Sequence, residues 1–280
     1  MGADWVASLP MYDFPELRGA HDVFWGALAA RLTSAGFPHV PRDLTHHVRP
    51  GEVWRDPSLL FAQGCEYPLA TSFADHVRLV ASPMYSAAGC EGARYRSAIV
   101  VRGGVVDGAA DSGFAGAALA DLRGRRCAIN ELDSNSGMNL LRAAIAPLAT
   151  GGRFFGSVVV SGSHLRSVEM VASGEADVAS VDCVSFAHFQ RLYPSVVGEL
   201  HVLAWTPSSP SLPFITARST GDATVRALRS ALADVFDDDG LAPVREQLLL
   251  SGVDLAPKEG FDEVLALERG AVEEGYSIIR

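Results

Sequence analysis

Strands and helices alternate along the middle of the chain, and this alternation restricts the fold more than any other feature of the sequence. Between residues 122 and 205, the strand-like segments are RRCAIN, FGSVVVSG, ADVASVDC and HVLAW, and the helix-like segments between them are SGMNLLRAAIAPLA, SHLRSVEMVASG and SFAHFQRLY. Short apolar strands that alternate with helices at this spacing predict a parallel sheet with helices on both faces. The middle of the chain is therefore predicted to form an α/β unit of its own.

The segments on either side of this unit predict a second lobe. A short strand in ADWVASLPM precedes a helix over about 15–35, and further strands are predicted at 58–64, 76–82 and 96–102. A Gly/Asp-rich loop is predicted at 103–116. After the middle unit the chain continues through a Pro/Ser-rich connector to PFITA and to helices that begin near 222, 241 and 261. The predicted division is lobe 1 at 1–101, lobe 2 at 102–205 and a return to lobe 1 at 206–280.

The charge and the N-terminal sequence exclude several classes of partner. The chain has 33 acidic and 23 basic residues and a formal charge of −10, which opposes binding to nucleic acid or to an anionic membrane. The sequence has no apolar run long enough to span a membrane and no basic N-terminal segment, so this chain is expected to carry neither a membrane span nor a signal peptide. Any bound anion must therefore be held by local hydrogen-bond donors.

Sequence patterns of catalytic and cofactor sites are missing. None of GxxxxGK[ST], GxGxxG, HExxH, GxSxG or CxxC occurs, and Lys258, the only lysine, stands in a loop-like context that does not favour pyridoxal-phosphate chemistry. Adjacent side chains point in different directions, so His46 and His47 do not predict a metal site. We expect no cofactor and no metal.

Four cysteines are too few for a disulfide scaffold. They are Cys65, Cys90, Cys127 and Cys183. Buried free thiols are the favoured interpretation, and a Cys65–Cys90 bridge in an oxidising compartment is the alternative.

The turn from RRCAIN into the following helix is the first candidate site. It holds Ser134, Asn135, Ser136 and Gly137 at the start of that helix. A helix start has amide groups without intrahelical acceptors and about half a positive charge, so it can hold an oxyanion. Serine hydroxyls would add donors, and Gly137 would let the ligand approach the backbone. Ordinary N-capping explains the same residues when they are taken alone.

Two more turns from a strand into a helix carry polar residues. They are SGSH at 161–164 and DCVS at 182–185. In a parallel sheet all three turns lie at one edge, so these residues are predicted to converge with Ser134–Gly137. His164 is predicted to donate to an anion, and Asp182 to receive a proton or a positively charged group of the ligand.

The opposite lobe provides aromatic and amide groups after its own strands. Tyr12, Gln63 and Tyr85 are predicted to form a neutral, hydrogen-bonding wall of the ligand site. Tyr67 stands in a similar position, but packing is the favoured interpretation of its role.

These residues together make the chain similar to a known family. It resembles the phosphate/phosphite/phosphonate-binding family of ABC-transporter solute receptors, through SLPMYDFPEL, QGCEYPL, ASPMY followed by YRSAIVVR, LRGRRCAINELDSNSG, VVVSGSH, GEADVASVDC and WTPSSPSLPFIT. The resemblance implies a two-lobed type II periplasmic-binding-protein fold, with a mainly parallel sheet and flanking helices in each lobe and two hinge crossings. In such receptors the serine-rich helix start binds the oxyanion head. The matching positions here are Ser134, Asn135, Ser136, His164, Asp182, Tyr12 and Tyr85.

The working hypothesis is a non-catalytic, monomeric solute-binding protein that captures phosphate, phosphite or a phosphonate in the cleft between the lobes for an ABC permease. A carboxylate near an anion favours a ligand that brings a proton or an ammonium group, and Asp182 provides this selectivity. Two alternatives remain open: a cytoplasmic ligand sensor, and an enzyme on the same fold that uses Cys183 or His164. The resemblance implies the periplasm, whereas the missing signal peptide leaves the cytoplasm open.

Overall fold

The computed structural model describes residues 5–103, 116–258 and 260–280, which form two compact units. The first unit comprises Met1–Ser86, Glu91–Ala93 and Pro210–Glu259, and the second comprises Ala87–Cys90, Arg94–Ser209 and Gly260–Arg280. The loop predicted at 103–116 lies outside the described residues except at its two ends.

Two segments belong to a different unit from the one that the sequence suggested. Strand β5 (Ser97–Arg102), which the expected boundary at 101/102 placed in lobe 1 except for Arg102, pairs with two strands of the second unit. Residues 260–280 also belong to the second unit, where helix α11 (Phe261–Glu273) packs on α5 (Leu140–Ile145). The spacing of apolar residues predicts that a segment has a buried face, but it does not identify the sheet or helix that covers this face.

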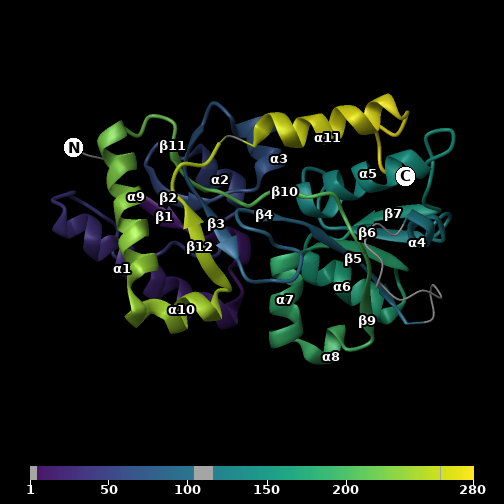
Figure 1. The fold of residues 1–280 in the computed structure, drawn as a ribbon, viewed down its shortest axis with the longest axis horizontal. Helices are drawn as coiled ribbons and strands as arrows, with labels where there is room; N and C mark the ends of the chain where they lie inside the picture. The colour runs from purple at the N-terminus through teal and green to yellow at the C-terminus, as the bar shows by residue number, and fades with distance from the viewer. Residues whose placement is uncertain (1–4, 104–115, 259) are drawn as a thin grey trace. The chain divides into compact units, whose positions relative to one another are not determined.

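The sheet of the first unit has the strand order β1-β2-β11-β3-β12 (Figure 1). Its strands are β1 (Val6–Ser8), β2 (Leu59–Gln63), β3 (Val77–Tyr85), β11 (Phe214–Ala217) and β12 (Leu250–Asp254). β1 is parallel to β2, β11 is antiparallel to β2 and β3, and β12 is antiparallel to β3, so this sheet is mixed and not mainly parallel as the resemblance implied. The first three strands along the chain therefore share one direction, and their carboxyl ends lie at one edge of the sheet.

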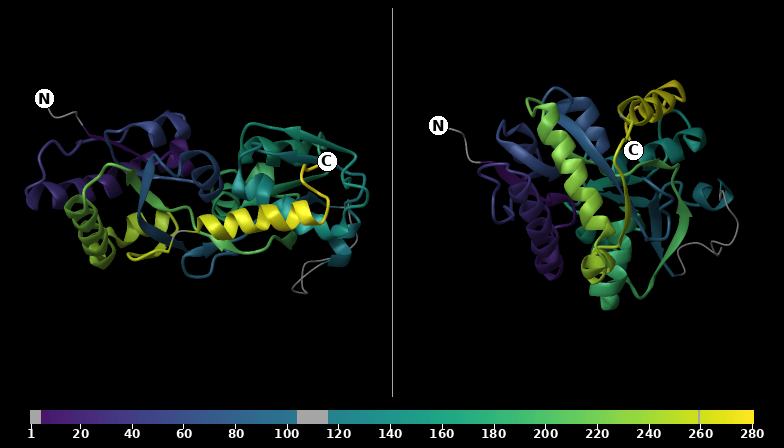
Figure 2. Two further views of the ribbon diagram at one scale, coloured as in Figure 1. Left: turned by 90° about the horizontal axis from the view of Figure 1, so that it is seen from above. Right: turned by 60° about the vertical axis from the view of Figure 1, so that its left-hand side comes forward.

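Helices cover this sheet and complete the core of the first unit. They are α1 (Arg18–Ser34), α2 (Pro50–Arg55), α3 (Glu66–Pro68), α9 (Asp222–Asp237) and α10 (Ala242–Gln247), with shorter turns η1 (Pro10–Tyr12), η2 (Pro15–Leu17), η3 (Leu69–Phe73) and η6 (Asp239–Leu241). α1 packs along α9 and α10 (Figure 2). From α1, Trp25 stacks on Phe61 of β2 with ring centroids 5.7 Å apart. Each such large buried side chain stabilises the fold by about 1.5–3 kcal/mol.

The sheet of the second unit has the order β7-β6-β8-β5-β9. The strands besides β5 are β6 (Arg126–Ile129), β7 (Ser157–Val160), β8 (Val178–Asp182) and β9 (Leu200–Trp205). β6 is parallel to β7 and β8, as predicted, whereas β5 is antiparallel to β8 and β9. The sheet is therefore mixed, because a strand from before the middle segment is inserted between the last two strands of that segment.

The helices of the second unit are α4 (Gly116–Ala120), η4 (Asn135–Asn139) continuing into α5 and η5 (Ala146–Leu148), α6 (His164–Ser173), α7 (Cys183–Leu192), α8 (Pro194–Val197) and α11. The helices after β6, β7 and β8 follow the predicted alternation, and α4, α8 and α11 are further helices of this unit. α6 packs on β5, β6 and β8, and α7 packs on β5 and β8. The carboxyl ends of β6, β7 and β8 are followed by the three polar turns of the predicted site.

Short elements were missed by the sequence analysis. β4 (Arg94–Tyr95) and β10 (Ser209–Pro210) form a two-stranded sheet, and α2 and β12 were not predicted either. Segments of two to six residues carry too few positions for a periodic pattern. In the part of the chain that the structure describes, no helix is long and apolar enough to cross a membrane.

Candidate functional site

Ser134 ends the turn after β6 and caps the helix that follows. Its hydroxyl oxygen accepts a 3.0 Å hydrogen bond from the Gly137 amide. Its carbonyl oxygen accepts a 3.0 Å bond from the Asn139 amide, which widens the first turn into a π-helical one. Ordinary N-capping is therefore present at this position. The amides of Asn135 and Ser136 lie in the same first turn, where a helix has no acceptor of its own for them.

The Ser136 hydroxyl connects this helix start to the neighbouring one. Its Oγ lies 2.8 Å from Nε2 of His164 and 3.4 Å from Oγ of Ser134. The carbonyl oxygen of Ser136 accepts a 2.8 Å hydrogen bond from the hydroxyl of Ser180 in β8. Because β6, β7 and β8 are parallel neighbours, the turns after them lie at one edge of the sheet. The structure thus brings the first two predicted turns together at the Ser136 hydroxyl.

His164 is the first residue of α6. Ser163 caps this helix, because its hydroxyl oxygen accepts a 3.1 Å hydrogen bond from the Arg166 amide. Burial lowers the pKa of His164 to about 4, so the ring is neutral near neutral pH. Its Nδ1 atom is buried and has no hydrogen-bond partner among the residues that the structure describes. A neutral imidazole donates through one nitrogen and accepts through the other, and a nearby anion would stabilise its protonated form.

Asn135 is committed to the interior of the second unit. Its Nδ2 donates to the Tyr95 hydroxyl at 3.0 Å and to the Ser209 hydroxyl at 2.8 Å. Its Oδ1 accepts a 3.0 Å hydrogen bond from Nδ2 of Asn139. The side chain is fully buried, so these contacts use both of its donor hydrogens and its acceptor. The remaining group of Asn135 that can serve the helix start is its backbone amide.

Gly137 is required by a protein contact that the sequence did not reveal. A Cβ added at this position would lie 1.8 Å from Oδ1 and 2.9 Å from Cγ of Asn130, so the Asn130 side chain would have to move to admit it. The side chain of Asn130, the residue after β6, therefore lies against Gly137 where a Cβ would stand, and a contact between Gly137 and a ligand remains a prediction. The identity of Gly137 is explained by packing against Asn130.

Asp182 stands at the carboxyl end of β8 and caps α7. Its Oδ1 accepts a 2.8 Å hydrogen bond from the Ser185 amide, and the residue is 2% exposed. The capping role that the sequence left open as an alternative is therefore observed. A contact between Asp182 and a ligand remains a prediction.

In the first unit, three predicted residues stand at or after the carboxyl ends of β1, β2 and β3 and contact one another. The rings of Tyr12 and Tyr85 meet edge to face, with centroids 5.6 Å apart and an interplanar angle of 75°. Gln63, the last residue of β2, donates from Nε2 to the Tyr85 hydroxyl at 2.8 Å and to the Leu212 carbonyl at 3.0 Å. Both hydrogens of the Gln63 amide are thus used within the unit. Gln63 orients Tyr85, which is a different role from the predicted contact with ligand.

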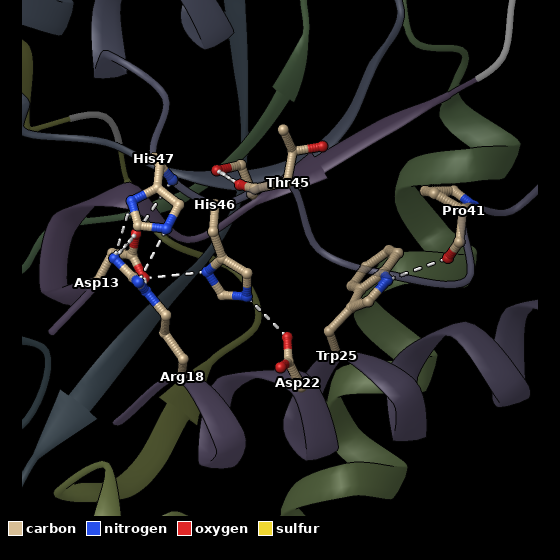
Figure 3. Close-up of polar contacts among 9 residues, drawn as sticks. Asp13, Arg18, Asp22, Trp25, Pro41, Thr45, His46 and His47 are labelled. Carbon is tan, nitrogen blue, oxygen red and sulfur yellow. Dashed lines mark hydrogen bonds and ion pairs between the residues drawn. The ribbon is translucent and has the colours of Figure 1, made fainter. Parts of the chain in front are cut away.

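A charged cluster next to Tyr12 was missed by the sequence analysis (Figure 3). Arg18 donates to both carboxylate oxygens of Asp13, from Nε at 2.7 Å and from a terminal nitrogen at 3.2 Å. His46 lies between two carboxylates, with Nδ1 3.0 Å from Asp13 and Nε2 2.8 Å from Asp22. The cluster ties the turn after β1 to the start of α1 and to the segment that holds His46.

The hydrogen bonds of this cluster decide the charge of Asp13. Burial alone would raise the pKa of Asp13, but the hydrogen bonds from Arg18, the His47 amide and His46 outweigh burial and hold the pKa below its usual value. The His46 side chain and the His47 amide therefore help to keep Asp13 ionised. Among the residues that the structure describes, no group of three or more His, Cys, Asp or Glu side chains is arranged to hold a metal ion.

Comparison with known proteins identifies relatives of this fold and sequence. The family model of the phosphonate ABC transporter's periplasmic substrate-binding protein matches residues 59–260. No curated protein sequence matches the chain. PhnD1 from Prochlorococcus marinus (MIT 9301), solved in complex with methylphosphonate, is similar with a TM-score of 0.72 and 13% identity, over 98% of this chain and 99% of that chain.

Two further solved structures resemble the chain over nearly its whole length. The binding protein component PA3383 of an ABC phosphonate transporter from Pseudomonas aeruginosa has a TM-score of 0.71 and 16% identity, over 97% of this chain and 87% of that chain. XAC2383 from Xanthomonas citri, bound to chloride ion, has a TM-score of 0.69 and 14% identity, over 99% of this chain and 100% of that chain.

These similarities confirm two predictions from the sequence. The solved structures share the α/β, two-lobed type II periplasmic-binding-protein fold that the order of motifs implied. The match to the family model, which covers more than half of the chain, confirms the resemblance that those motifs carried. The chain belongs to the phosphonate-binding family of periplasmic substrate-binding proteins that serve ABC transporters.

Proposed function

We propose that this protein captures a small oxyanion of the phosphate, phosphite or phosphonate class and presents it to the permease of an ABC transporter. The observation that carries this proposal is the continuous row of Ser134 Oγ, Ser136 Oγ and His164 Nε2 across two helix starts. Family membership supports the transporter as partner, and the methylphosphonate bound to PhnD1 supports the ligand class.

The row of donors suits an anion although the chain as a whole is negative. Hydroxyl groups, helix-start amides and a neutral imidazole donate hydrogen bonds without a buried positive charge, so these donors avoid the cost of burying an unpaired cation. The dipole of the helix adds about half a positive charge at the same place. With a formal charge of −10 on the chain, these local groups would provide the attraction.

Asp182 is proposed to select among anions. Its carboxylate repels an anion that is fully ionised, whereas a protonated oxygen or an ammonium group of the ligand can donate to it. We therefore expect hydrogen phosphate, phosphite or an aminoalkylphosphonate to bind better than sulfate.

The aromatic groups of the first unit are proposed to contact the same ligand. Tyr12 and Tyr85 support one another edge to face, and Gln63 holds the Tyr85 hydroxyl. Closure of the two lobes on the ligand is the expected mode of capture for this fold. We expect the protein to act as a monomer in the periplasm.

The alternative of an enzyme with a Cys183 nucleophile is disfavoured by the surroundings of that thiol. A hydrogen bond with Cys90 and burial raise the pKa of Cys183. A thiol with a raised pKa holds little thiolate near neutral pH and is a poor nucleophile. This observation favours binding over catalysis.

Calorimetric titration of the purified chain tests the proposal. The ligands are phosphate, phosphite, methylphosphonate, an aminoalkylphosphonate and sulfate, each at the same ionic strength. We expect at least one phosphorus oxyanion to bind at least about tenfold more tightly than sulfate, a difference of about 1.4 kcal/mol. Equal affinity for sulfate would overturn the selectivity assigned to Asp182, and no binding by any member of the panel would overturn the ligand class.

A further inference from the structure

Two cysteines far apart in sequence meet in the second unit. The Sγ atoms of Cys90 and Cys183 lie 3.4 Å apart. Cys90 belongs to the loop between β3 and β4, and Cys183 is the first residue of α7. All four cysteines are free thiols in this structure. The alternative weighed from the sequence paired Cys90 with Cys65, whereas the structure places Cys183 against Cys90.

A backbone hydrogen bond and the shape of Gly89 hold the Cys90 turn against α7. The Cys90 amide donates to the Ala87 carbonyl at 3.0 Å, which closes a tight turn. Gly89, with a φ of +95°, lets this turn approach α7, because a Cβ added there would lie 3.1 Å from Cβ of Cys183 and 2.6 Å from the ring of Trp205. A disulfide bond is about 2.05 Å long, so the sulfurs must approach by roughly 1.4 Å, which side-chain rotation can supply.

We propose that Cys90 and Cys183 are an oxidation site and form an intramolecular disulfide in an oxidising compartment such as the periplasm. The oxidant is a disulfide, either of a small thiol or of a thiol-oxidising protein. One thiolate of the pair attacks the oxidant and forms a mixed disulfide, which releases the first thiol of the oxidant. The second thiolate then attacks the protein sulfur of that mixed disulfide and releases the second thiol. The protein loses two electrons and two protons, and the oxidant is reduced to two thiols.

The exposure of the two sulfurs determines the order of these steps. Cys90 is half-buried, whereas Cys183 is 2% exposed. An external disulfide therefore reaches Cys90 first, and Cys183 acts as the resolving thiol. The hydrogen bond with the Cys90 thiol is the first cause of the raised pKa of Cys183, and this cause is removed once Cys90 has formed the mixed disulfide. Burial still raises the pKa of Cys183, so the second step should be faster at alkaline than at neutral pH.

The bond would link the loop after β3 to the residue that follows Asp182. Asp182 caps α7 through the Ser185 amide, so a covalent tie at Cys183 holds the same helix start. Cys90 and Cys183 are 93 residues apart along the chain. A disulfide that closes so long a loop restricts the unfolded chain strongly, so the oxidised protein should unfold at a higher temperature than the reduced protein. This inference is independent of the proposed ligand.

The test uses the full, reduced wild-type chain and oxidised glutathione. Free thiols are alkylated before and after oxidation, and peptides are mapped by mass spectrometry without reduction. Before oxidation we expect all four cysteines to be alkylated. After oxidation we expect only Cys65 and Cys127 to be alkylated, and one linked peptide to contain Cys90 and Cys183. The rate of this change should increase from neutral to alkaline pH, and the oxidised chain should show the higher midpoint of thermal unfolding.

Three variants sharpen the outcome. Cys65→Ser should form the same linked peptide, whereas Cys90→Ser should form none and Cys183→Ser should stop at a glutathione adduct on Cys90. Four unchanged thiols in the wild type, a lasting glutathione adduct on wild-type Cys90, or a bridge that includes Cys65 or Cys127 would each overturn the proposal. The wild-type map decides the question even if a variant fails to fold.

Discussion

Oγ of Ser136 and Nε2 of His164 lie 2.8 Å apart and join two helix starts that are 28 residues apart along the chain. The contact exists because β6 and β7 are parallel neighbours, so that the turns after them leave the sheet at the same edge. Ser134 extends the row, with its Oγ 3.4 Å from that of Ser136. This contact between two helix starts is the reason that an ordinary N-cap becomes a candidate site, because it places donors from two helices side by side.

Ser136→Ala should weaken anion binding by about 1–3 kcal/mol, because it removes a hydroxyl donor and leaves His164 without its partner. The measurement is calorimetric titration with the tightest ligand of the panel. Ser173→Ala is the matched control, since Ser173 is an exposed serine at the opposite end of α6 and should leave the affinity unchanged. If Ser136→Ala binds as tightly as the wild type, the hydroxyl is no ligand donor.

Buried His21 should make the protein less stable as the pH falls. Burial lowers the pKa of His21 to about 4, whereas the unfolded chain keeps a value near about 6.5. Between these values the unfolded state binds more protons, so the free energy of unfolding decreases with decreasing pH. From about pH 7 to about pH 5, His21 should contribute about 2 kcal/mol to this loss, which is measured by urea denaturation as the difference between wild type and a His21 variant.

His21→Gln removes this titration. Between about pH 7 and about pH 5, the free energy of unfolding of this variant should therefore fall by about 2 kcal/mol less than that of the wild type. Exposed His76, changed to glutamine, is the control and should keep the wild-type slope. An equal slope in His21→Gln and the wild type would contradict the role of His21.

Gly137→Ala should destabilise the second unit by about 1–3 kcal/mol, because the new Cβ collides with Asn130. The free energy of unfolding is measured in urea for Gly137→Ala, for Asn130→Ala and for the double variant that carries both changes. The double variant should recover part of the loss, since the colliding atoms are removed. Gly26→Ala in α1, where an added Cβ meets no atom within 4 Å, should be neutral or slightly stabilising. Additive losses in the double variant would show that Asn130 is not the obstacle.

Asp13→Asn should cost about 1–2 kcal/mol of stability at neutral pH, because it weakens the charged hydrogen bonds to Arg18 and His46 (Figure 3). The pKa of Asp13 is held below its usual value, so its contribution is present at neutral pH and is lost as the pH falls through the acid range. Chemical denaturation at neutral and at acid pH should therefore show a difference between variant and wild type that shrinks toward low pH. Asp22→Asn, at a more exposed carboxylate of the same cluster, should change stability by less than about 0.5 kcal/mol.

The elements could be predicted from the sequence because their patterns are local. The helix predicted over about 15–35 is observed as η2 and α1, ending at Ser34, and β6, β7 and β8 lie within the segments that alternation marked. The order of motifs along the chain was sufficient to identify the family. The position of Ser134 and Ser136 at a helix start was also readable, since an N-cap depends on residues within one turn.

Contacts between distant residues were decided by the tertiary structure alone. The pairing of β5 with β8, the cover of Gly137 by Asn130, and the inward bonds of Asn135 each depend on which segments become neighbours in space. The same holds for the Asp13 cluster and for the meeting of Cys90 with Cys183. Local spacing determines which face of a segment is apolar and where a turn begins, so the sequence by itself determined the family, the alternating elements and the helix-start serines. Which partner covers a face is a property of the assembled core, and for this reason only the tertiary structure decided which of those serines and histidines share a hydrogen bond.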